Sequence, residues 1–289
     1  MDYGLCLPNF LDGASPEGID AAAGVAERLG WSTVWTTDHI LVPNADASDY
    51  GRIYEAIVTL AWVGSRYTRI RLATSVIVVP QRNAVVLAKE LATLDSLSGG
   101  RVSAGVGIGW NETEFANVGA ADRFHVRGAY LDETIRLWRH LWSGSTEPFR
   151  GRFHTIEDFV FGPLPGQAQV PIIVGGRAEA ALRRAGTLGD GYHSSAVGPS
   201  GYAERVQVVR AAAEAAGRPV PSLSARVRVQ FGEGGGGYAM RGSPGEIATE
   251  VRAFAAAGAE HLALYFDTTD PAELVARAER FDREVAPLV

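Results

Sequence analysis

Cysteine is almost absent from the sequence, and long apolar runs and basic clusters are absent altogether. The single cysteine, Cys6, stands in an apolar stretch, which predicts a small buried core residue and not a nucleophile or a metal ligand. No apolar run approaches the roughly 20 residues of a membrane span, and residues 1–20 lack a secretory signal, so we expect a cytoplasmic protein with no membrane partner. A net charge of −6 without any basic block speaks against nucleic acid as a partner.

The sequence is dominated instead by short β-branched runs that alternate with longer helical patterns. Strands are predicted at 2–7, 32–37, 69–79, 101–107, 171–175, 190–195, 224–231 and 260–266. Apolar residues at three- and four-residue spacing predict a helix after each strand, at 16–29, 53–66, 83–97, 126–143, 177–188, 199–216, 243–257 and 271–286. Repeated units of this kind indicate an α/β protein with a parallel sheet.

Eight consecutive βα units predict a closed (β/α)8 barrel, the TIM barrel, as a single domain of residues 1–289. A closed barrel leaves no sheet edge to protect, which favours it over an open sheet. The connection between the fourth and fifth strands, at 108–170, is far longer than an ordinary crossover and is predicted to be an insertion. Its segment FHTIEDFVF, at 153–161, is predicted to form a hairpin.

The C-terminal ends of barrel strands supply the reacting groups of barrel enzymes, and several chemistries find no candidates there. A Schiff-base site needs a buried lysine, whereas the only lysine of the chain, Lys89, lies inside a predicted helix. The first strand carries no histidine, so no metal site is predicted, although Asp38 and His39 leave a weak one open. His193 and Ser194 are neighbours in sequence, which does not make them a base and its nucleophile.

The strand ends that remain are rich in glycine, which favours a barrel that holds an organic cofactor. Gly175, Gly176 and Arg177 precede a predicted helix, where free N–H groups and the guanidinium would meet a phosphate. The alternative is a helix start that needs glycine only for tight packing. Gly107 and Gly109 would let a flat ring approach the backbone, or they too serve packing.

Four blocks of the chain resemble the bacterial luciferase-like monooxygenase superfamily, whose members are flavin- or deazaflavin-dependent oxidoreductases on a (β/α)8 barrel. The most specific is RLATSVIVVPQRNAVVLAKELATLDSLSGGRVSAGVGIGWNETEF at 71–115. The others, in the same order as in the superfamily, are AERLGWSTVWTTDHI at 26–40, RGAYLDETIRLWRHLW at 127–142 and PLPGQAQVPIIVGGR at 163–177. The resemblance covers most of the chain and is weak beyond about residue 199.

Within this superfamily the chain resembles the branch that uses the deazaflavin coenzyme F420. In deazaflavin-using relatives the segment that matches Thr74, Ser75 and Val76 forms a bulge, with a non-prolyl cis peptide bond behind the ring. A plain strand with Ser75 facing the core is the alternative. The abundance of alanine and the single lysine are typical of the high-GC genomes in which this coenzyme is common.

The resemblance implies a role for each matching residue. His39 would lie beside the ring and hydrogen-bond the substrate or move a proton, because histidine exchanges protons near neutral pH; alternatively, it only orients the ring. Asp38 would anchor the loop backbone or His39. The implied cofactor contacts are Asp38, His39, Thr74, Ser75, Val76, Gly107, Gly109, Gly175, Gly176 and Arg177.

The chain also departs from the pattern of the relatives that oxidise sugar phosphates. Trp110 stands where they carry a glutamate, and their phosphate-binding lysines have no counterpart, so glucose 6-phosphate is a poor candidate substrate. Trp110 is expected to stack on the ring or to wall the pocket, and Glu112 and Glu114 to be solvated helix residues. The glycine-rich segment 232–244 is predicted to be a mobile lid or an inert loop, with Arg241 as a candidate contact for an anion.

Three functions are compatible with these observations. The first is an F420-dependent oxidoreductase that exchanges a hydride between the coenzyme and a small organic substrate, with His39 as the proton partner. The second is a monooxygenase in which reduced FMN activates oxygen. The third is a flavin- or deazaflavin-binding protein with little turnover. The resemblance also implies a homodimer.

Overall fold

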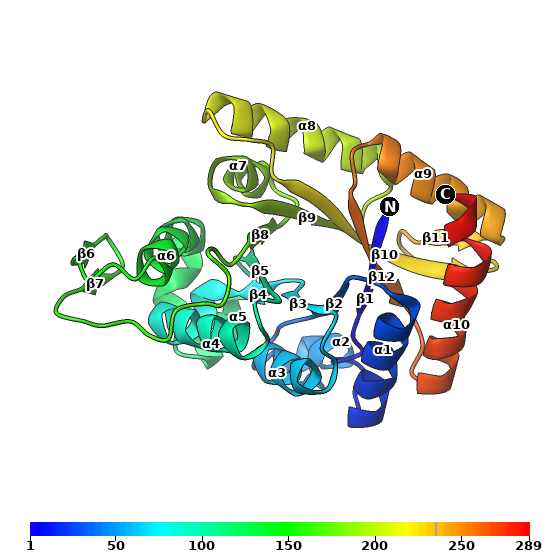
Figure 1. Cartoon of the computed structure of the whole chain (residues 1–289), viewed down its shortest axis with the longest axis horizontal. Helices are drawn as coiled ribbons and strands as arrows, with labels where there is room; N and C mark the ends of the chain where they lie inside the picture. The colour runs from blue at the N-terminus through cyan, green and yellow to red at the C-terminus, as the bar shows by residue number, and fades with distance from the viewer. Residues whose placement is uncertain (235) are drawn as a thin grey trace.

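In the computed structural model, eight parallel strands close into a barrel, which confirms the predicted fold class (Figure 1). The structure describes residues 1–234 and 236–289. Each barrel strand pairs with the next along the chain, and the last pairs with the first through the register Gly4 to Ala263. The barrel strands are β1 (Asp2–Cys6), β2 (Thr33–Thr36), β3 (Arg71–Thr74), β5 (Val102–Gly107), β8 (Ile172–Gly175), β9 (Gly191–Ser195), β10 (Ser222–Phe231) and β12 (His261–Phe266).

The predicted helices are all present and cover the outside of the barrel (Figure 1). Their observed bounds are α1 (Pro16–Leu29), α3 (Ala56–Arg66), α4 (Ala84–Leu97), α6 (Arg127–Trp142), α7 (Glu179–Leu188), α8 (Pro199–Ala215), α9 (Pro244–Ala256) and α10 (Pro271–Glu284). Side chains of Ser15, Ser243 and Asp270 accept hydrogen bonds from the first turns of α1, α9 and α10, so these starts are set locally. Within the described residues, no helix is long and apolar enough to cross a membrane.

Short elements lie in the connections. They are η1 (Asn44–Asp46), α2 (Ala47–Tyr50), β4 (Ile77–Val78), η2 (Val79–Gln81), α5 (Glu112–Asn117), η3 (Ala121–Val126), β11 (Met240–Gly242) and η4 (Ala286–Leu288). Most of them follow the C-terminal ends of barrel strands, so they build the rim of the barrel at that end.

The third strand is not the continuous run predicted for 69–79. It divides into β3 and β4, and the Ser75–Val76 peptide bond between them is cis, as the resemblance implies. Three glycines, two on the adjacent strand β5 and one on the next strand β8, leave room for this bulge. A Cβ at Gly105 would collide with the Thr74 carbonyl oxygen, and Cβ atoms at Gly107 and Gly175 would lie 2.5 and 2.6 Å from the Val76 methyl groups.

The predicted insertion between the fourth and fifth strands is present and contains α5, η3, α6 and a hairpin that lies beyond α6 at the left of Figure 1. The hairpin pairs β6 (Phe149–Arg150) with β7 (Thr155–Ile156), so only its second strand falls in the predicted 153–161 segment. The buried Glu133 carboxylate of α6 fixes the turn by accepting the N–H groups of residues 152, 153 and 154. A distant carboxylate therefore sets the register, which local residue preferences did not predict.

The apolar core lies mainly between the barrel and its helices, where Val, Ile and Leu of the strands meet the helix faces. Inside the barrel the apolar cluster is small and consists of Cys6, Trp35, Ala73 and Ala263. Cys6 is 4% exposed, which confirms its prediction as a core residue, and burial raises the pKa of its thiol. Because so little apolar material fills the barrel, polar side chains occupy much of its interior toward the C-terminal mouth.

We expect Gly105→Ala to lower the free energy of unfolding by about 2–3 kcal/mol, as overpacked cores do, because the new Cβ would collide with the Thr74 carbonyl oxygen. Gly245→Ala is the matched control, since a Cβ there meets no atom within 4 Å. Urea unfolding followed by circular dichroism compares the two variants. Equal unfolding midpoints would contradict the packing role of Gly105.

Candidate active site at the barrel mouth

His39 follows β2 at the barrel mouth and pairs with a buried carboxylate from α5. Its Nδ1 lies 2.9 Å from Oε2 of Glu114, and the two side chains are 7% and 1% exposed. Glu114 is thus not the solvated helix residue that we expected, whereas Glu112, two positions earlier, is exposed. Our expectation was wrong because α5 turns Glu114 inward, where its carboxylate contacts His39 and the Ile40 N–H.

The Glu114 carboxylate fixes which nitrogen of His39 is available. Burial disfavours its charged form, but hydrogen bonds from His39 and from the Ile40 N–H, at 2.7 Å, outweigh this and hold the pKa of Glu114 below its ordinary 4.5. A carboxylate only accepts, so His39 Nδ1 carries the proton. The second ring nitrogen, Nε2, is left for exchange with a ligand.

Aromatic rings enclose His39 on two sides. The Tyr50 ring centroid lies 4.1 Å from that of His39, and the Trp110 ring meets His39 edge-on at 5.9 Å. Trp110 is 56% exposed, so it stands at the rim and is available to wall a pocket. The stacking continues from Tyr50 to Phe10 and from Phe10 to Tyr265, which forms one aromatic side of the mouth.

Arg226 brings a positive charge into this mouth from β10. Its guanidinium lies 5.5 Å from the Phe10 ring and 5.4 Å from the Tyr265 ring, and Nη1 donates to Thr37 Oγ1 at 3.1 Å. Among the described residues, no carboxylate lies within ion-pair distance of it. Arg226 was missed in the sequence, although the alternation of polar and apolar residues over 224–230 already assigns it to the inner face of a barrel strand.

Asp38 is an anchor inside the protein. Its Oδ2 accepts the Val78 N–H at 2.8 Å and its Oδ1 pairs with Arg82 at 2.6 Å, and the side chain is fully buried. Arg82 also pairs with Glu55 at 2.8 Å. Both Asp38 oxygens therefore help to hold the loop after β2 against β4 and the segment that carries Arg82, and a cofactor contact of Asp38 stays a prediction.

The bulge residues differ in what they present to the mouth. Thr74 is buried, and its hydroxyl donates to the Gly105 carbonyl at 2.6 Å. Ser75 and Val76 are half-buried, and the Ser75 hydroxyl lies 3.0 Å from Nε2 of His193. Val76 fills the space next to Gly107 and Gly175. These two glycines therefore leave room for the bulge, and their cofactor contacts stay predictions.

The predicted phosphate site lies where β8 passes into α7. Gly176 has φ +143°, and a Cβ there would lie 2.6 Å from that of Ala181, so the position requires glycine with or without a ligand. Gly109 likewise has φ +70°. Ala178, the N-cap of α7, makes no side-chain hydrogen bond to the helix, and Arg177 beside it is exposed. The Ala181 N–H donates to the Ala178 carbonyl at 2.8 Å, so of the first turn the N–H groups of Glu179 and Ala180 remain for an anion, and the phosphate site stays a prediction.

The predicted lid at 232–244 includes residue 235, which lies outside the described residues. Arg241 does not point to the mouth as a free cation. Its guanidinium donates to the Gly237 carbonyl at 2.8 Å and the Gly236 carbonyl at 3.2 Å, so it holds its own loop. Residues 1–234 and 236–289 bring together no group of three His, Cys, Asp or Glu side chains that could bind a metal ion.

Residues 1–234 match the sequence profile of the luciferase-like monooxygenase family, and the chain therefore belongs to this family. An F420-dependent glucose-6-phosphate dehydrogenase of Kineococcus radiotolerans is 32% identical over 209 residues, which cover 71% of this chain and 61% of that enzyme. This chain spans less than two thirds of the length of several such relatives, including an uncharacterised protein of Mycobacterium tuberculosis, of which 65% aligns at 35% identity.

Solved structures share the fold over the whole chain. An F420-dependent secondary alcohol dehydrogenase in complex with an F420-acetone adduct superposes with a TM-score of 0.84 at 18% identity, covering 100% of this chain and 98% of that one. The oxygenating constituent of 3,6-diketocamphane monooxygenase from Pseudomonas putida, in complex with FMN, gives 0.82 at 17% identity with the same coverage. At such low identity the likeness shows the fold alone.

We expect Glu114→Gln to lower the free energy of unfolding at pH 7 by about 2 kcal/mol, the value of a hydrogen bond to a charged group. The pKa of Glu114 is depressed in the folded protein, so this stability is present above the unfolded-state pKa near 4.5 and is lost as the pH falls through the folded value. The difference in the free energy of unfolding between wild type and Glu114→Gln should therefore narrow below pH 4.5.

The matched control for this variant is Glu112→Gln, whose side chain is 65% exposed and faces only His125 at 3.5 Å. Urea unfolding at several pH values compares the three proteins. The free energies of unfolding of wild type and Glu114→Gln could instead differ by a constant amount down to the lowest pH at which both fold. This outcome would show that the charge of Glu114 does not stabilise the fold.

Proposed function

We propose that this protein is an F420-dependent oxidoreductase that exchanges a hydride between the deazaflavin coenzyme and a small organic substrate. The observation that carries the proposal is the His39 and Glu114 pair at the barrel mouth, next to the bulge at Ser75. A histidine oriented by a buried carboxylate, with its outer nitrogen open to the mouth, is suited to proton exchange with a bound substrate. The F420-dependent relatives support the choice of coenzyme.

When bound, the deazaflavin would supply the hydride chemistry, and the protein would supply position and charge. His39 Nε2 would accept a proton from a substrate hydroxyl or donate one to a carbonyl oxygen. The Glu114 carboxylate, 2.9 Å from Nδ1, would stabilise the imidazolium while Nε2 holds the transferred proton. Arg226 would favour any ligand group on which negative charge develops, since no carboxylate of the described residues lies within 4.0 Å of it.

The residues present fit such a coenzyme. The bulge offers a half-buried Ser75 and Val76 as the floor of the mouth, and the aromatic side of Phe10, Tyr50 and Tyr265 suits a planar ring. The uncapped start of α7 with Arg177 suits the phosphate of a coenzyme tail. Trp110, 56% exposed at the rim, would wall the pocket beside a bound substrate.

An FMN-dependent monooxygenase is the second candidate function. It is favoured by the FMN-containing neighbour, whose TM-score of 0.82 is close to the 0.84 of the F420-dependent one. A low-turnover flavin- or deazaflavin-binding protein is the third. A cytoplasmic location and a homodimer remain predictions from the sequence.

A parallel titration of the purified protein with oxidised F420 and with FMN separates these functions. We expect F420 to bind at micromolar concentration or tighter and FMN to bind weakly. The F420 complex is then incubated with a panel of secondary alcohols, and loss of F420 absorbance reports hydride transfer. Tight FMN binding with oxygen uptake by the reduced complex would favour the monooxygenase, and F420 binding without any reaction would favour the binding protein.

We expect His39→Asn to slow hydride transfer at least tenfold, roughly 1.4 kcal/mol of barrier, and to leave coenzyme affinity almost unchanged. The Asn amide can still donate to Glu114, but it cannot exchange a proton. His125→Asn is the control, because the His125 side chain is 80% exposed on η3. Single-turnover absorbance measures the rate, and a variant as fast as wild type would remove His39 from the chemistry.

A further inference from the structure

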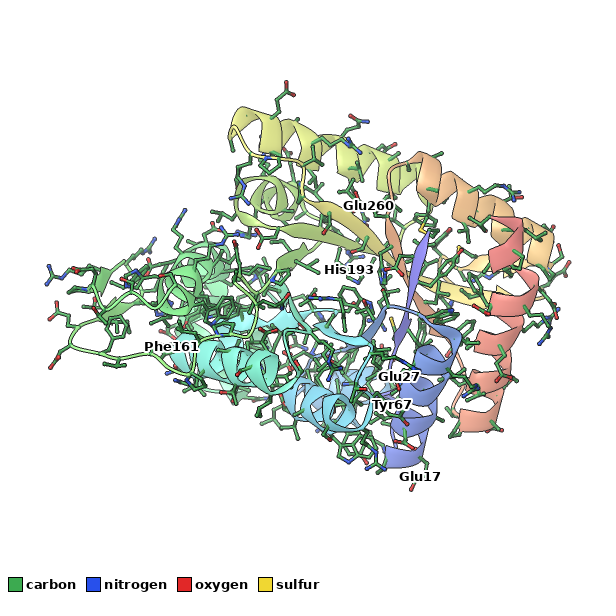
Figure 2. All side chains as sticks on the ribbon, in the orientation of Figure 1. Glu17, Glu27, Tyr67, Phe161, His193 and Glu260 are labelled. Carbon is green, nitrogen blue, oxygen red and sulfur yellow. The ribbon has the colours of Figure 1, made fainter. Side chains whose placement is uncertain are left out.

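His193 is a buried histidine in the middle of the barrel that the proposed chemistry does not use. Figure 2 labels it near the centre of the ring of strands, and it is 2% exposed. Its ring stacks on Trp35 with centroids 4.4 Å apart and an interplanar angle of 9°. Both ring nitrogens have hydroxyl partners, Ser224 Oγ at 2.8 Å from Nδ1 and Ser75 Oγ at 3.0 Å from Nε2.

The directions of these hydrogen bonds follow from counting protons. Ser224 Oγ lies 3.1 Å from the Tyr192 carbonyl, which can only accept, so the single Ser224 hydroxyl proton is donated there. Ser224 must then accept from His193, and Nδ1 carries the imidazole proton. Nε2 is left as an acceptor, and the Ser75 hydroxyl donates to it.

The other tautomer of neutral His193, with its proton on Nε2, is less favourable. If Nε2 carried the proton, Ser224 would have to donate to Nδ1 at 2.8 Å, and its oxygen would face the Tyr192 carbonyl at 3.1 Å with no proton between them. Two oxygens that both carry lone pairs repel each other at this distance, which disfavours the Nε2–H tautomer.

The surroundings also keep His193 neutral. Burial, together with His261 and Arg226 nearby, lowers the pKa of His193 to about 3. The other groups that face it are the Trp35 ring and the two serine hydroxyls, none of which is charged. The direction of the hydrogen bonds therefore does not change over the working pH range.

We propose that His193 is a positioning residue that draws the only proton of the Ser75 hydroxyl into the barrel, so that Ser75 offers lone pairs alone to the mouth. A ligand group that contacts Ser75 must then be a hydrogen-bond donor. Resting on the proposed function, this assigns to Ser75 the imide N–H at position 3 of the ring, a donor that deazaflavins and flavins share. Ring recognition at the floor of the mouth is thus set by a residue that the ligand does not touch.

The tautomer is tested on the free protein by 15N NMR of histidine. We expect a protonated Nδ1 and an unprotonated Nε2 for His193 in wild type, unchanged between pH 5.5 and 8. Ser224→Ala removes the acceptor that fixes Nδ1–H, so the two tautomers should interconvert in that variant while the fold is kept. A protonated Nε2 in wild type would overturn the proposal.

The proposed contact between Ser75 and the imide N–H is tested by measuring binding affinity. We compare oxidised F420, or FMN if that coenzyme binds instead, with the derivative methylated at the imide nitrogen. Wild type should bind the parent about tenfold more tightly than the methylated ring, the effect of one hydrogen bond, and Ser75→Ala should remove the difference. Ser65→Ala, an exposed serine of α3, is the control and should retain it.

Failure of the proposed function and failure of the donor assignment at Ser75 give different results. If neither coenzyme binds, the proposed function is wrong, and the NMR measurement on the free protein still decides the role of His193. If a coenzyme binds but the methylated ring binds equally well to wild type, the donor assignment at Ser75 is wrong and the proposed function stands.

Discussion

The division of the third strand at Ser75 and Val76 is the constraint on which the mouth of this barrel depends. The bulge fits only because Gly105 and Gly107 of β5 and Gly175 of β8 leave space for it. It places the Ser75 hydroxyl 3.0 Å from Nε2 of His193, and the Val78 N–H beyond it donates to Asp38. Asp38 in turn fixes the loop that carries His39. The packing of small residues in the sheet thereby helps to determine where the His39 ring lies.

Charge in the mouth is arranged in two different ways. His39 lies against a buried carboxylate, so that a proton gained at Nε2 is stabilised at once by Glu114. Arg226 instead rests on aromatic faces and a hydroxyl, and its charge remains available to a ligand. His193 between them carries no charge and transmits only a hydrogen-bond direction. The protein as a whole is acidic, with a net charge of −6, yet the guanidinium of Arg226 lies in this part of the barrel.

The barrel and its mouth place different demands on the amino-acid sequence. The fold is kept at 17–18% identity in structures that hold different coenzymes, since strands and helices require only a pattern of apolar residues. The mouth is enclosed by α2, α5 and the loops around them, which interact through side chains such as Asn111 and Asp46 at 2.6 Å. Trp110 stands among these short segments and is 56% exposed.

The sequence by itself determined the order of the eight units, the helix bounds to within a few residues and the starts of α1, α9 and α10, because periodicity and capping are local. It also indicated His39 and the bulge through family resemblance. Only the tertiary structure decided that Glu114 joins His39, since 75 residues separate them and no local pattern distinguishes Glu114 from the exposed Glu112. Ser75 lies between β3 and β4, His193 on β9 and Ser224 on β10, so the hydrogen bonds that orient Ser75 exist only when barrel closure brings these segments together.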